Sequence, residues 1–255
     1  MQTTLVQSYR TSRVAPWVAT CLDSVRAWAA DRGWDYRFVD DAIFDLLPAA
    51  YRANARGCIP IMTDLGRLLL ARRYLARGAQ RVIWMDADVL VFDPAGLDIR
   101  VGWEFAFGRE VWVQRDPGGR LRAYRNVHNA VAVFCAGNSF LDFYIHACQA
   151  VVGRLETGGP PQIVGTKLLT ALHNMIGFTL VDDVAMFSPA VLRDLAAGGG
   201  EALDRLRRES PAPPRAANLC GSLAGTAGGL DDAGLAAVCD RLLANGRALF
   251  SAGCP

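Results

Sequence analysis

The chain has 255 residues, with 27 Lys or Arg side chains against 25 Asp or Glu, so its formal net charge is only +2. No stretch concentrates basic side chains into a stripe along a nucleic-acid backbone, and a nucleic-acid partner is therefore not expected. Hydrophobic residues make up 52% and charged residues 20%, a balance that excludes a disordered or fibrous chain. No apolar run approaches the roughly 18 to 20 residues of a transmembrane segment, and the N-terminus lacks the features of a signal peptide. We therefore expect a cytoplasmic protein, with peripheral association at a membrane left open.

The 7 cysteines are scattered along the chain, and no two of them form a CxxC pair. Their odd number and wide spacing predict neither a disulfide framework nor a local zinc site. We interpret them as small core residues in a reducing environment.

Strand and helix patterns alternate through the first third of the chain. Pro16 in a first helical turn and Gly33 as a stop frame one helix, whereas Thr63 is the expected N-cap of a second helix that ends at Gly78. Two apolar runs, RVIWM and VLVF, flank an acidic DAD triplet at 86–88 and are the strongest strand signal. The predicted elements are strands at 3–9, 34–40, 81–85 and 89–92 and helices at 16–32 and 64–77.

The rest of the chain first continues this pattern and then changes in composition. From Ala196 onward Gly, Pro and Ala become frequent, which predicts a mobile segment before a final helix. The predicted elements are strands at 103–115, 128–137 and 177–181 and helices at 138–156, 165–175, 201–209 and 231–250. Strands that alternate with helices indicate an α/β fold with a mixed, mostly parallel central sheet flanked by helices, and such folds bind ligands at the carboxyl ends of their strands.

Asp86 and Asp88 are the most informative polar residues. In a strand, residues two apart point to the same side, so both carboxylates would face one ligand. Two like charges at the end of a buried strand are costly unless a cation joins them, and carboxylate oxygens suit Mn²⁺ or Mg²⁺. This pattern predicts a metal–diphosphate site. The alternative is that both aspartates leave the strand into solvent and cap a turn.

The segment WMDADVLVF resembles the DxD motif of glycosyltransferases with the nucleotide-diphospho-sugar transferase (glycosyltransferase-A) fold. The preceding residues TDLGRLLLARRYLARGAQRVI are similar to the helix and strand before this motif in the sugar transferases related to mannosyl- and galactosyltransferases and clostridial glucosylating toxins. The opening LVQSYR resembles the first strand of that group. The resemblance covers about residues 4–190 and implies a single Rossmann-like catalytic domain.

Within that domain, the resemblance implies three parts with different tasks. Residues 1–100 would form the nucleotide-binding half that ends in the DxD motif. Residues 101–195 would bind the donor sugar and the acceptor, and residues 196–255 would form a mobile C-terminal segment and helix.

The resemblance also assigns a catalytic group of four residues. Asp88 would bind the metal, and Asp86 would hold hydroxyls of the donor and help to hold the metal. Asp64 and Arg67 would reach the donor sugar from their helix. The alternative for this pair is an ordinary ion pair between helical residues three apart.

Further donor contacts are implied at the ends of strands and at a glycine. Gln7, Ser8 and Tyr9 at the end of the first strand would meet the base, with Tyr9 as a stacking ring. Asn129, which follows His128, would lie near the donor sugar, although a structural cap is the alternative. Gly165 would allow close approach of the backbone to the donor.

The related enzymes often supply a late metal ligand as a histidine, and the matching segment NLCGS lacks one. Asn218 or Ser222 would then contribute an oxygen ligand instead.

The implied reaction is the transfer of a hexose from a nucleoside-diphosphate sugar, UDP rather than GDP, to a hydroxyl of a glycan or other acceptor. The metal cofactor would be Mn²⁺ or Mg²⁺, and the expected outcome is retention of the anomeric configuration. The expected setting is bacterial polysaccharide or glycan synthesis.

Two other readings remain open. A haloacid-dehalogenase-like phosphohydrolase would use Asp86 as nucleophile, Asp88 as general acid, Lys167 as phosphate anchor and the later pair Asp182 and Asp183. A non-catalytic sugar-nucleotide binding protein is the second reading. A nucleotidyltransferase is not favoured, because no glycine-rich phosphate loop follows the first strand.

Overall fold

The computed structural model describes residues 1–99, 104–156, 159–226 and 228–250. Its helices are α1 Pro16–Asp31, α2 Ala49–Ala55, α3 Ile59–Ala76, α4 Phe140–Gly153, α5 Thr166–Ile176, α6 Pro189–Ala197, α7 Glu201–Glu209 and α8 Asp232–Phe250, with short 3₁₀ helices η1 Asp41–Leu46 and η2 Gly221–Leu223. Its strands are β1 Thr3–Ser8, β2 Asp35–Val39, β3 Arg81–Met85, β4 Val89–Val91, β5 Phe105–Arg115, β6 Leu121–Cys135, β7 Leu180–Val181, β8 Val184–Met186 and β9 Ala216–Asn218.

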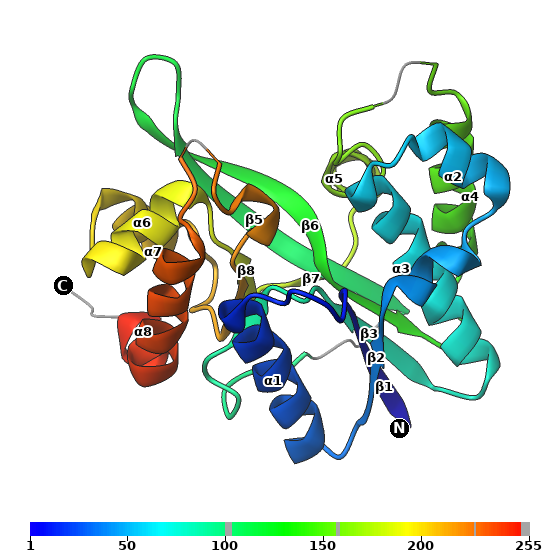
Figure 1. The fold of residues 1–255 in the computed structure, drawn as a ribbon, viewed down its shortest axis with the longest axis horizontal. Coiled ribbons are helices and arrows are strands. Elements are labelled where there is room, and N and C mark those ends of the chain that lie inside the picture. Colours follow the sequence, from blue (N-terminus) through cyan, green and yellow to red (C-terminus); the bar gives the residue numbers. More distant parts are fainter. Residues whose placement is uncertain (100–103, 157–158, 227, 251–255) are drawn as a thin grey trace.

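The central sheet has the strand order β2-β1-β3-β6-β5-β7 and is flanked by helices (Figure 1). β1 pairs in parallel with β2 and β3, and β5 pairs in parallel with β7, whereas β6 runs antiparallel to β3 and β5. β5 and β6 form a long hairpin that extends beyond the rest of the sheet (Figure 1). The predicted α/β class with a mixed, mostly parallel sheet is confirmed.

Alternation along β3 explains why both faces of the sheet are covered. Val82 and Trp84 belong to the core shared with α3 and α4, whereas Ile83 and Met85 belong to the core shared with α1. Successive strand residues point to opposite faces, so a continuous apolar run is typical of a strand buried on both sides. The sheet thus forms the middle layer between the two groups of helices.

Helix α3 begins earlier than predicted. It starts at Ile59 with Pro60 in its first turn, and Thr63 lies inside the helix rather than at its N-cap. The fixed φ of proline suits a first turn, where its missing N–H costs no hydrogen bond. The prediction of Thr63 as N-cap was therefore wrong.

The sequence pattern indicated that the run VLVF continues in line with β3. Instead, it forms β4 in a second, three-stranded sheet of order β4-β9-β8. The Asp86 carbonyl accepts a hydrogen bond from the Val89 N–H at 3.1 Å, so the acidic triplet lies in a turn between the two strands. The expected same-side arrangement along one strand was therefore wrong.

The C-terminal third contains a core of its own. β9 is buried and pairs on both edges, with β4 and with β8. Side chains of α1, α6, α7 and α8 pack around this small sheet. Residues 216–219 are therefore core residues rather than an irregular stretch, and mobility of the following segment stays a prediction. The expected boundary at 100–101, Trp103 of the predicted strand and residues 251–255 lie outside the described residues.

Candidate functional site

Asp86 is held by two residues on the α3 side of the sheet. Its Oδ1 accepts hydrogen bonds from Trp84 Nε1 at 2.6 Å and from Arg67 Nη1 at 3.0 Å. The Arg67 guanidinium also lies 5.0 Å from the centre of the Trp84 ring, where a cation is attracted by the aromatic face. Trp84 precedes Asp86 by two residues, so both leave β3 towards the same helix layer.

Arg67 joins Asp86 to a second acid on its own helix. Arg67 Nη2 lies 3.1 Å from Asp64 Oδ1, and both side chains are only 6% exposed. Asn129 Nδ2 donates to Asp64 Oδ1 at 2.7 Å, and the Asn129 carbonyl accepts from Arg67 Nη1 at 2.5 Å. Asp64 and Arg67 thus form the helical ion pair, and Arg67 also contacts Asp86 of the acidic turn, whereas their contact with a donor sugar stays a prediction.

Gly165 closes this cluster from the start of α5. A Cβ atom at this position would lie 2.8 Å from Asp64 Oδ2 and 3.0 Å from Asn129 Nδ2. Asp64 is buried and held by two partners, so it has little freedom to move away. The glycine is therefore required by its close contact with Asp64 and Asn129, whereas the predicted approach of its backbone to the donor stays a prediction.

Strand β1 supports the acidic turn through the side chain of Gln7. Gln7 is fully buried; its Nε2 donates to the Asp86 carbonyl at 3.1 Å, and its Oε1 accepts from Tyr36 Oη at 3.1 Å. Both ends of the Gln7 amide are therefore occupied, and its expected contact with a nucleotide base is replaced by a structural role. Ser8 and Tyr9 are partly exposed at the end of β1, and their contact with a base stays a prediction.

Asp88 is held by a different part of the chain. Asn218 Nδ2 donates to Asp88 Oδ1 at 2.6 Å, and the Gly221 N–H donates to Asp88 Oδ2 at 2.7 Å. The Leu219 N–H donates to the Asp88 carbonyl at 2.9 Å. Residues 218–221 therefore wrap around Asp88.

This wrap depends on an uncommon backbone conformation and on a glycine. Cys220 has φ of 51°, in the left-handed region that non-glycine residues rarely occupy. A Cβ at Gly221 would lie 2.8 Å from the Trp17 ring and 3.2 Å from Asp88 Oδ2. Trp17 in turn donates from Nε1 to Asp232 Oδ1 at 2.8 Å, which ties α1 to α8 at this point.

The predicted role of Asn218 as an oxygen ligand of a metal is not supported by this arrangement. Its Oδ1 accepts a hydrogen bond from the Cys220 N–H at 2.7 Å, and its nitrogen faces Asp88. β9 places Asn218 opposite Val89 in the small sheet, so its amide orients Asp88. Ser222 is exposed.

The cluster carries more negative than positive charge. Asp64, Asp86 and Asp88 are three carboxylates against the guanidinium of Arg67, which leaves two negative charges when all are ionised. Burial raises the pKa of Asp64 to about 6, although Arg67 opposes the shift. Burial and then the charge of Asp86 raise the pKa of Asp88 to about 6. Burial disfavours the Arg67 cation, but Asp86 and Asp64 outweigh it and raise the pKa of Arg67.

The donor set fits a hard divalent cation that keeps open positions. Within the described residues, no hydrogen bond engages Asp86 Oδ2, and no group of three or more His, Cys, Asp or Glu side chains is arranged around one metal. The protein would thus supply the two carboxylates Asp86 and Asp88. Mg²⁺ and Mn²⁺ suit one or two carboxylates when phosphates and water complete the coordination.

Sequence reasoning missed Trp84 and Gly221 as parts of the site. The position of Trp84 two residues before Asp86 was a usable signal, because strand alternation places the two on one face. Gly221 carried no such signal, since its contact with Asp88 spans a separation of 133 residues. His128 is fully buried and its Nε2 lies 3.0 Å from the Val184 carbonyl, so it joins the central sheet to β8.

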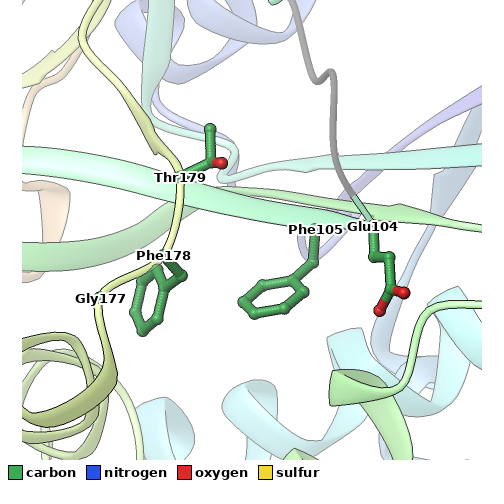
Figure 2. Close-up of a pocket in the computed structure, with 5 residues that line it drawn as sticks. All are labelled: Glu104, Phe105, Gly177, Phe178 and Thr179. Atoms are coloured by element: carbon green, nitrogen blue, oxygen red, sulfur yellow. The ribbon is translucent and has the colours of Figure 1, made fainter.

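One pocket lies away from the acidic turn. It has a volume of about 590 Å³. Its lining residues are Glu104, Phe105, Gly177, Phe178 and Thr179 (Figure 2). Phe105 pairs with Phe134, which pairs with Val82 near the start of β3, so the cavity lies at the amino ends of the strands. Its lining includes two phenylalanine rings, and its carboxylate, Glu104, accepts hydrogen bonds from the Ser139 N–H and hydroxyl at 3.0 Å.

The residues required by the phosphohydrolase reading are dispersed. Lys167 is exposed, and Asp182 forms an ion pair with Arg109 Nε at 2.5 Å. No hydrogen bond or ion pair joins Lys167, Asp182 or Asp183 to Asp86 in the described parts of the chain. This reading is therefore not favoured.

The chain matches no known protein-family model and no curated protein. Among solved structures, it is similar to a glycosyltransferase involved in the glycosylation of the major capsid of PBCV-1, with 10% identity, a TM-score of 0.46 and coverage of 94% of this chain and 98% of that chain. It is similar to the galactosyltransferase LgtC in complex with donor and acceptor sugar analogues, with 14% identity, a TM-score of 0.48 and coverage of 94% and 95%. A197 from STIV matches with 10% identity, a TM-score of 0.26 and coverage of 56% and 68%.

None of the helices in the described residues has both the length and the apolar character needed to cross a bilayer.

Proposed function

We propose that the protein is a metal-dependent glycosyltransferase that moves a hexose from a nucleoside-diphosphate sugar to an acceptor hydroxyl. The observation that carries this proposal is the cluster at the carboxyl ends of the strands. Asp64, Arg67, Asp86, Asn129 and Gly165 come from four separate segments and meet in one buried network, to which Asp88 adds a second carboxylate of the acidic turn. Such edges of α/β sheets are where ligands bind.

The net charge of the network supports a diphosphate with its metal as the ligand. Asp86 and Asp88 would hold Mn²⁺ or Mg²⁺, which supplies charge neutralisation for the departing diphosphate when it is bound. Arg67 forms an ion pair with Asp86 at 3.0 Å and fixes the orientation of its carboxylate. Asn129 and Gly165 contact Asp64, and the donor sugar would lie beside them.

In the proposed reaction, the bond between the anomeric carbon and the β-phosphate oxygen breaks, and a bond between the anomeric carbon and the acceptor oxygen forms. The electron pair of the broken bond leaves with the nucleoside diphosphate, which also takes the acceptor proton. We propose retention of the anomeric configuration, UDP rather than GDP as the nucleotide, and a place in bacterial polysaccharide or glycan synthesis. These finer assignments rest on the sequence resemblance.

The test is calorimetric titration of UDP and GDP with Mn²⁺, with EDTA, and on Asp88→Ala. We expect micromolar binding of UDP that requires both Mn²⁺ and Asp88. Asp142→Ala is the matched control, because Asp142 is an exposed acid on α4. Binding that is unchanged by EDTA and by Asp88→Ala would contradict the metal site. Hydrolysis of a phosphomonoester without nucleotide binding would instead favour the phosphohydrolase.

A non-catalytic binding protein would pass the titration, so turnover must be measured separately. We expect slow release of UDP from a UDP-hexose in the absence of acceptor. Tight binding of UDP without any such release would favour the non-catalytic reading.

A further inference from the structure

Glu110 is a buried acid that the donor site does not use. It lies on β5 and is 5% exposed, and its Oε1 accepts a hydrogen bond from Asn126 Nδ2 at 2.9 Å. Within the described residues, no hydrogen bond or ion pair engages its second oxygen, Oε2. Burial raises the pKa of this carboxyl, and the hydrogen bond from Asn126 opposes the shift. Among the described residues, Trp28 Nε1 and Arg205 Nε are the fully buried side-chain atoms without a hydrogen-bond partner, and Glu110 Oε2 is not one of them. This oxygen therefore reaches the surface, where a ligand can contact it.

Glu110 lies towards the same end of the central sheet as the acidic turn. β5 runs in the same direction as β3, and Glu110 follows Phe107, which is level with Trp84 across the sheet. The thiol of Cys220 has its pKa raised by burial and then by the nearby charges of Asp88 and Glu110. Cys220 belongs to the wrap around Asp88. Glu110 therefore lies at the same end of the central sheet as this wrap, on the face of the sheet opposite Arg67.

The face of the hairpin that carries Glu110 continues as an aromatic and polar surface. Residues at alternate positions share one face of a strand, so Trp112 and Gln114 lie on the face of Glu110. The register of the two strands places Tyr124 opposite Trp112 and Asn126 opposite Glu110. Tyr124 is 40% exposed and Trp112 is partly exposed.

The opposite face of the same hairpin is part of the core. Val111 and Val113 are buried in the core that includes α7. The two exposed rings are therefore not needed to complete that core. Aromatic rings with adjacent hydrogen-bonding groups suit ligands that have an apolar face and polar edges, which is the character of a sugar ring.

We propose that Glu110 and Asn126 bind a hydroxyl of a sugar acceptor, and that Trp112 and Tyr124 form the platform on which its ring rests. This inference rests on the proposed glycosyltransferase function and deepens it, because it names a glycan unit as the acceptor. Glu110 acts as an acceptor-binding residue. Its position beside the wrap around Asp88 places the acceptor next to the donor diphosphate.

The experiment measures UDP release from UDP-glucose and UDP-galactose with Mn²⁺, without acceptor and with the methyl glycosides of glucose, galactose and mannose. We expect at least one glycoside to accelerate UDP release by the wild-type protein. Glu110→Gln should reduce that acceleration about tenfold or more, because a hydrogen bond to a charged group is lost. Its acceptor-independent UDP release and its calorimetric affinity for UDP should equal those of the wild type.

Two further variants keep the test independent of folding at a buried site. Tyr124→Ala changes an exposed ring and should raise the KM for the glycoside with little change in acceptor-independent release. Glu104→Gln is the matched control at the opposite edge of the sheet, where Glu104 accepts from Ser139, and should behave as the wild type.

The outcomes separate this inference from the proposed function. Full acceleration in both Glu110→Gln and Tyr124→Ala would overturn the inference, as would loss of UDP affinity in proportion to the loss of acceleration. A wild-type protein that binds UDP and releases it from the donor, but is accelerated by none of the glycosides, would refute a sugar acceptor and leave the transferase proposal standing. A protein that does not bind UDP at all would refute the proposed function and this inference with it.

Discussion

Asp86 and Asp88 are two residues apart, yet opposite parts of the molecule hold them. Asp86 is bound by Arg67 and Trp84, which belong to the helix and strand immediately before it. Asp88 is bound by Asn218 and Gly221, which lie 130 and 133 residues further along the chain. One carboxylate is therefore set by a neighbouring helix and the other by the C-terminal third.

The two carboxylates also differ in how their charge is balanced. Asp86 has a direct ion pair with Arg67, whereas Asp88 receives an amide N–H of Asn218 and a backbone N–H of Gly221. Neutral donors orient a carboxylate without cancelling its charge. We infer that Asp86 is neutralised by the protein, whereas Asp88 is the acid that gains most from a bound cation.

The largest effect should come from removing the cation that binds Asp86. Arg67→Met leaves Asp64 and Asp86 without their buried cation, and we expect a loss of about 3–5 kcal/mol in the free energy of unfolding. Urea denaturation followed by circular dichroism measures this loss. Arg72→Met is the matched control on the same helix, because its ion pair with Asp142 is exposed and should contribute less than about 1 kcal/mol. Equal losses in the two variants would contradict the network.

The contribution of Asp88 to the free energy of unfolding should change with pH in the opposite sense from that of a salt-bridged acid. Its folded pKa is raised from 3.8 to about 6, so the metal-free protein loses stability as pH rises through this window, and the full cost is present at pH 7. Asp88→Asn should therefore be more stable than the wild type at pH 7 without metal, by roughly 1–3 kcal/mol, and the difference should vanish towards pH 4.

Thermal or urea unfolding in EDTA at several pH values measures this difference. His128 acts in the opposite direction, because burial lowers its pKa from 6.5 to about 4 and stability is lost as pH falls through that window. Both proteins retain His128, so the difference between them isolates Asp88. Mn²⁺ should stabilise the wild type and leave Asp88→Asn unchanged. A wild type that is more stable than the variant at pH 7 in EDTA would contradict this prediction.

A smaller effect should come from Gly221→Ala. Its Cβ would contact the Trp17 ring and Asp88, so the wrap must shift away from the carboxylate. We expect a roughly tenfold loss of Mn²⁺-dependent UDP affinity, equivalent to about 1.4 kcal/mol, by calorimetry. Gly153→Ala is the control, because no atom lies within 4 Å of a Cβ at that position. An unchanged Mn²⁺-dependent affinity for UDP in Gly221→Ala would mean that the wrap of residues 218–221 does not influence metal binding.

The smallest effect should come from Tyr36→Phe on the Asp86 side. This change removes the hydroxyl that donates to Gln7, which in turn supports the Asp86 carbonyl. We expect a loss of about 0.5–1.5 kcal/mol in the free energy of unfolding, with UDP affinity nearly unchanged. A large loss of affinity would mean that the support of the acidic turn is more sensitive to distortion than the geometry indicates.

The comparison of the two carboxylates also explains which parts of the site could be predicted from the sequence. Asp86 was identified because two apolar runs flank the acidic triplet, whereas Asp64 and Arg67 were implied only by the resemblance to the DxD-containing sugar transferases. Gln7 was placed correctly at the end of β1, but its hydrogen bonds to the Asp86 carbonyl and to Tyr36 could not be foreseen. The start of α3 was misplaced because Thr63 is a good N-cap residue, although Pro60 also suits the first turn of a helix.

By itself, the sequence determined the α/β class, the central strands and the position of the acidic triplet between two apolar runs, because hydrophobic periodicity and local turn signals depend on near neighbours. Only the tertiary structure decided that VLVF joins a second sheet, that β9 pairs with it, and that Asn218 binds Asp88 through its nitrogen. Pairing between strands far apart in sequence leaves no periodic mark in either strand, and a weakly patterned segment such as 216–221 gains its structure from its partners. The half of the site that depends on such pairing was therefore beyond the reach of local patterns.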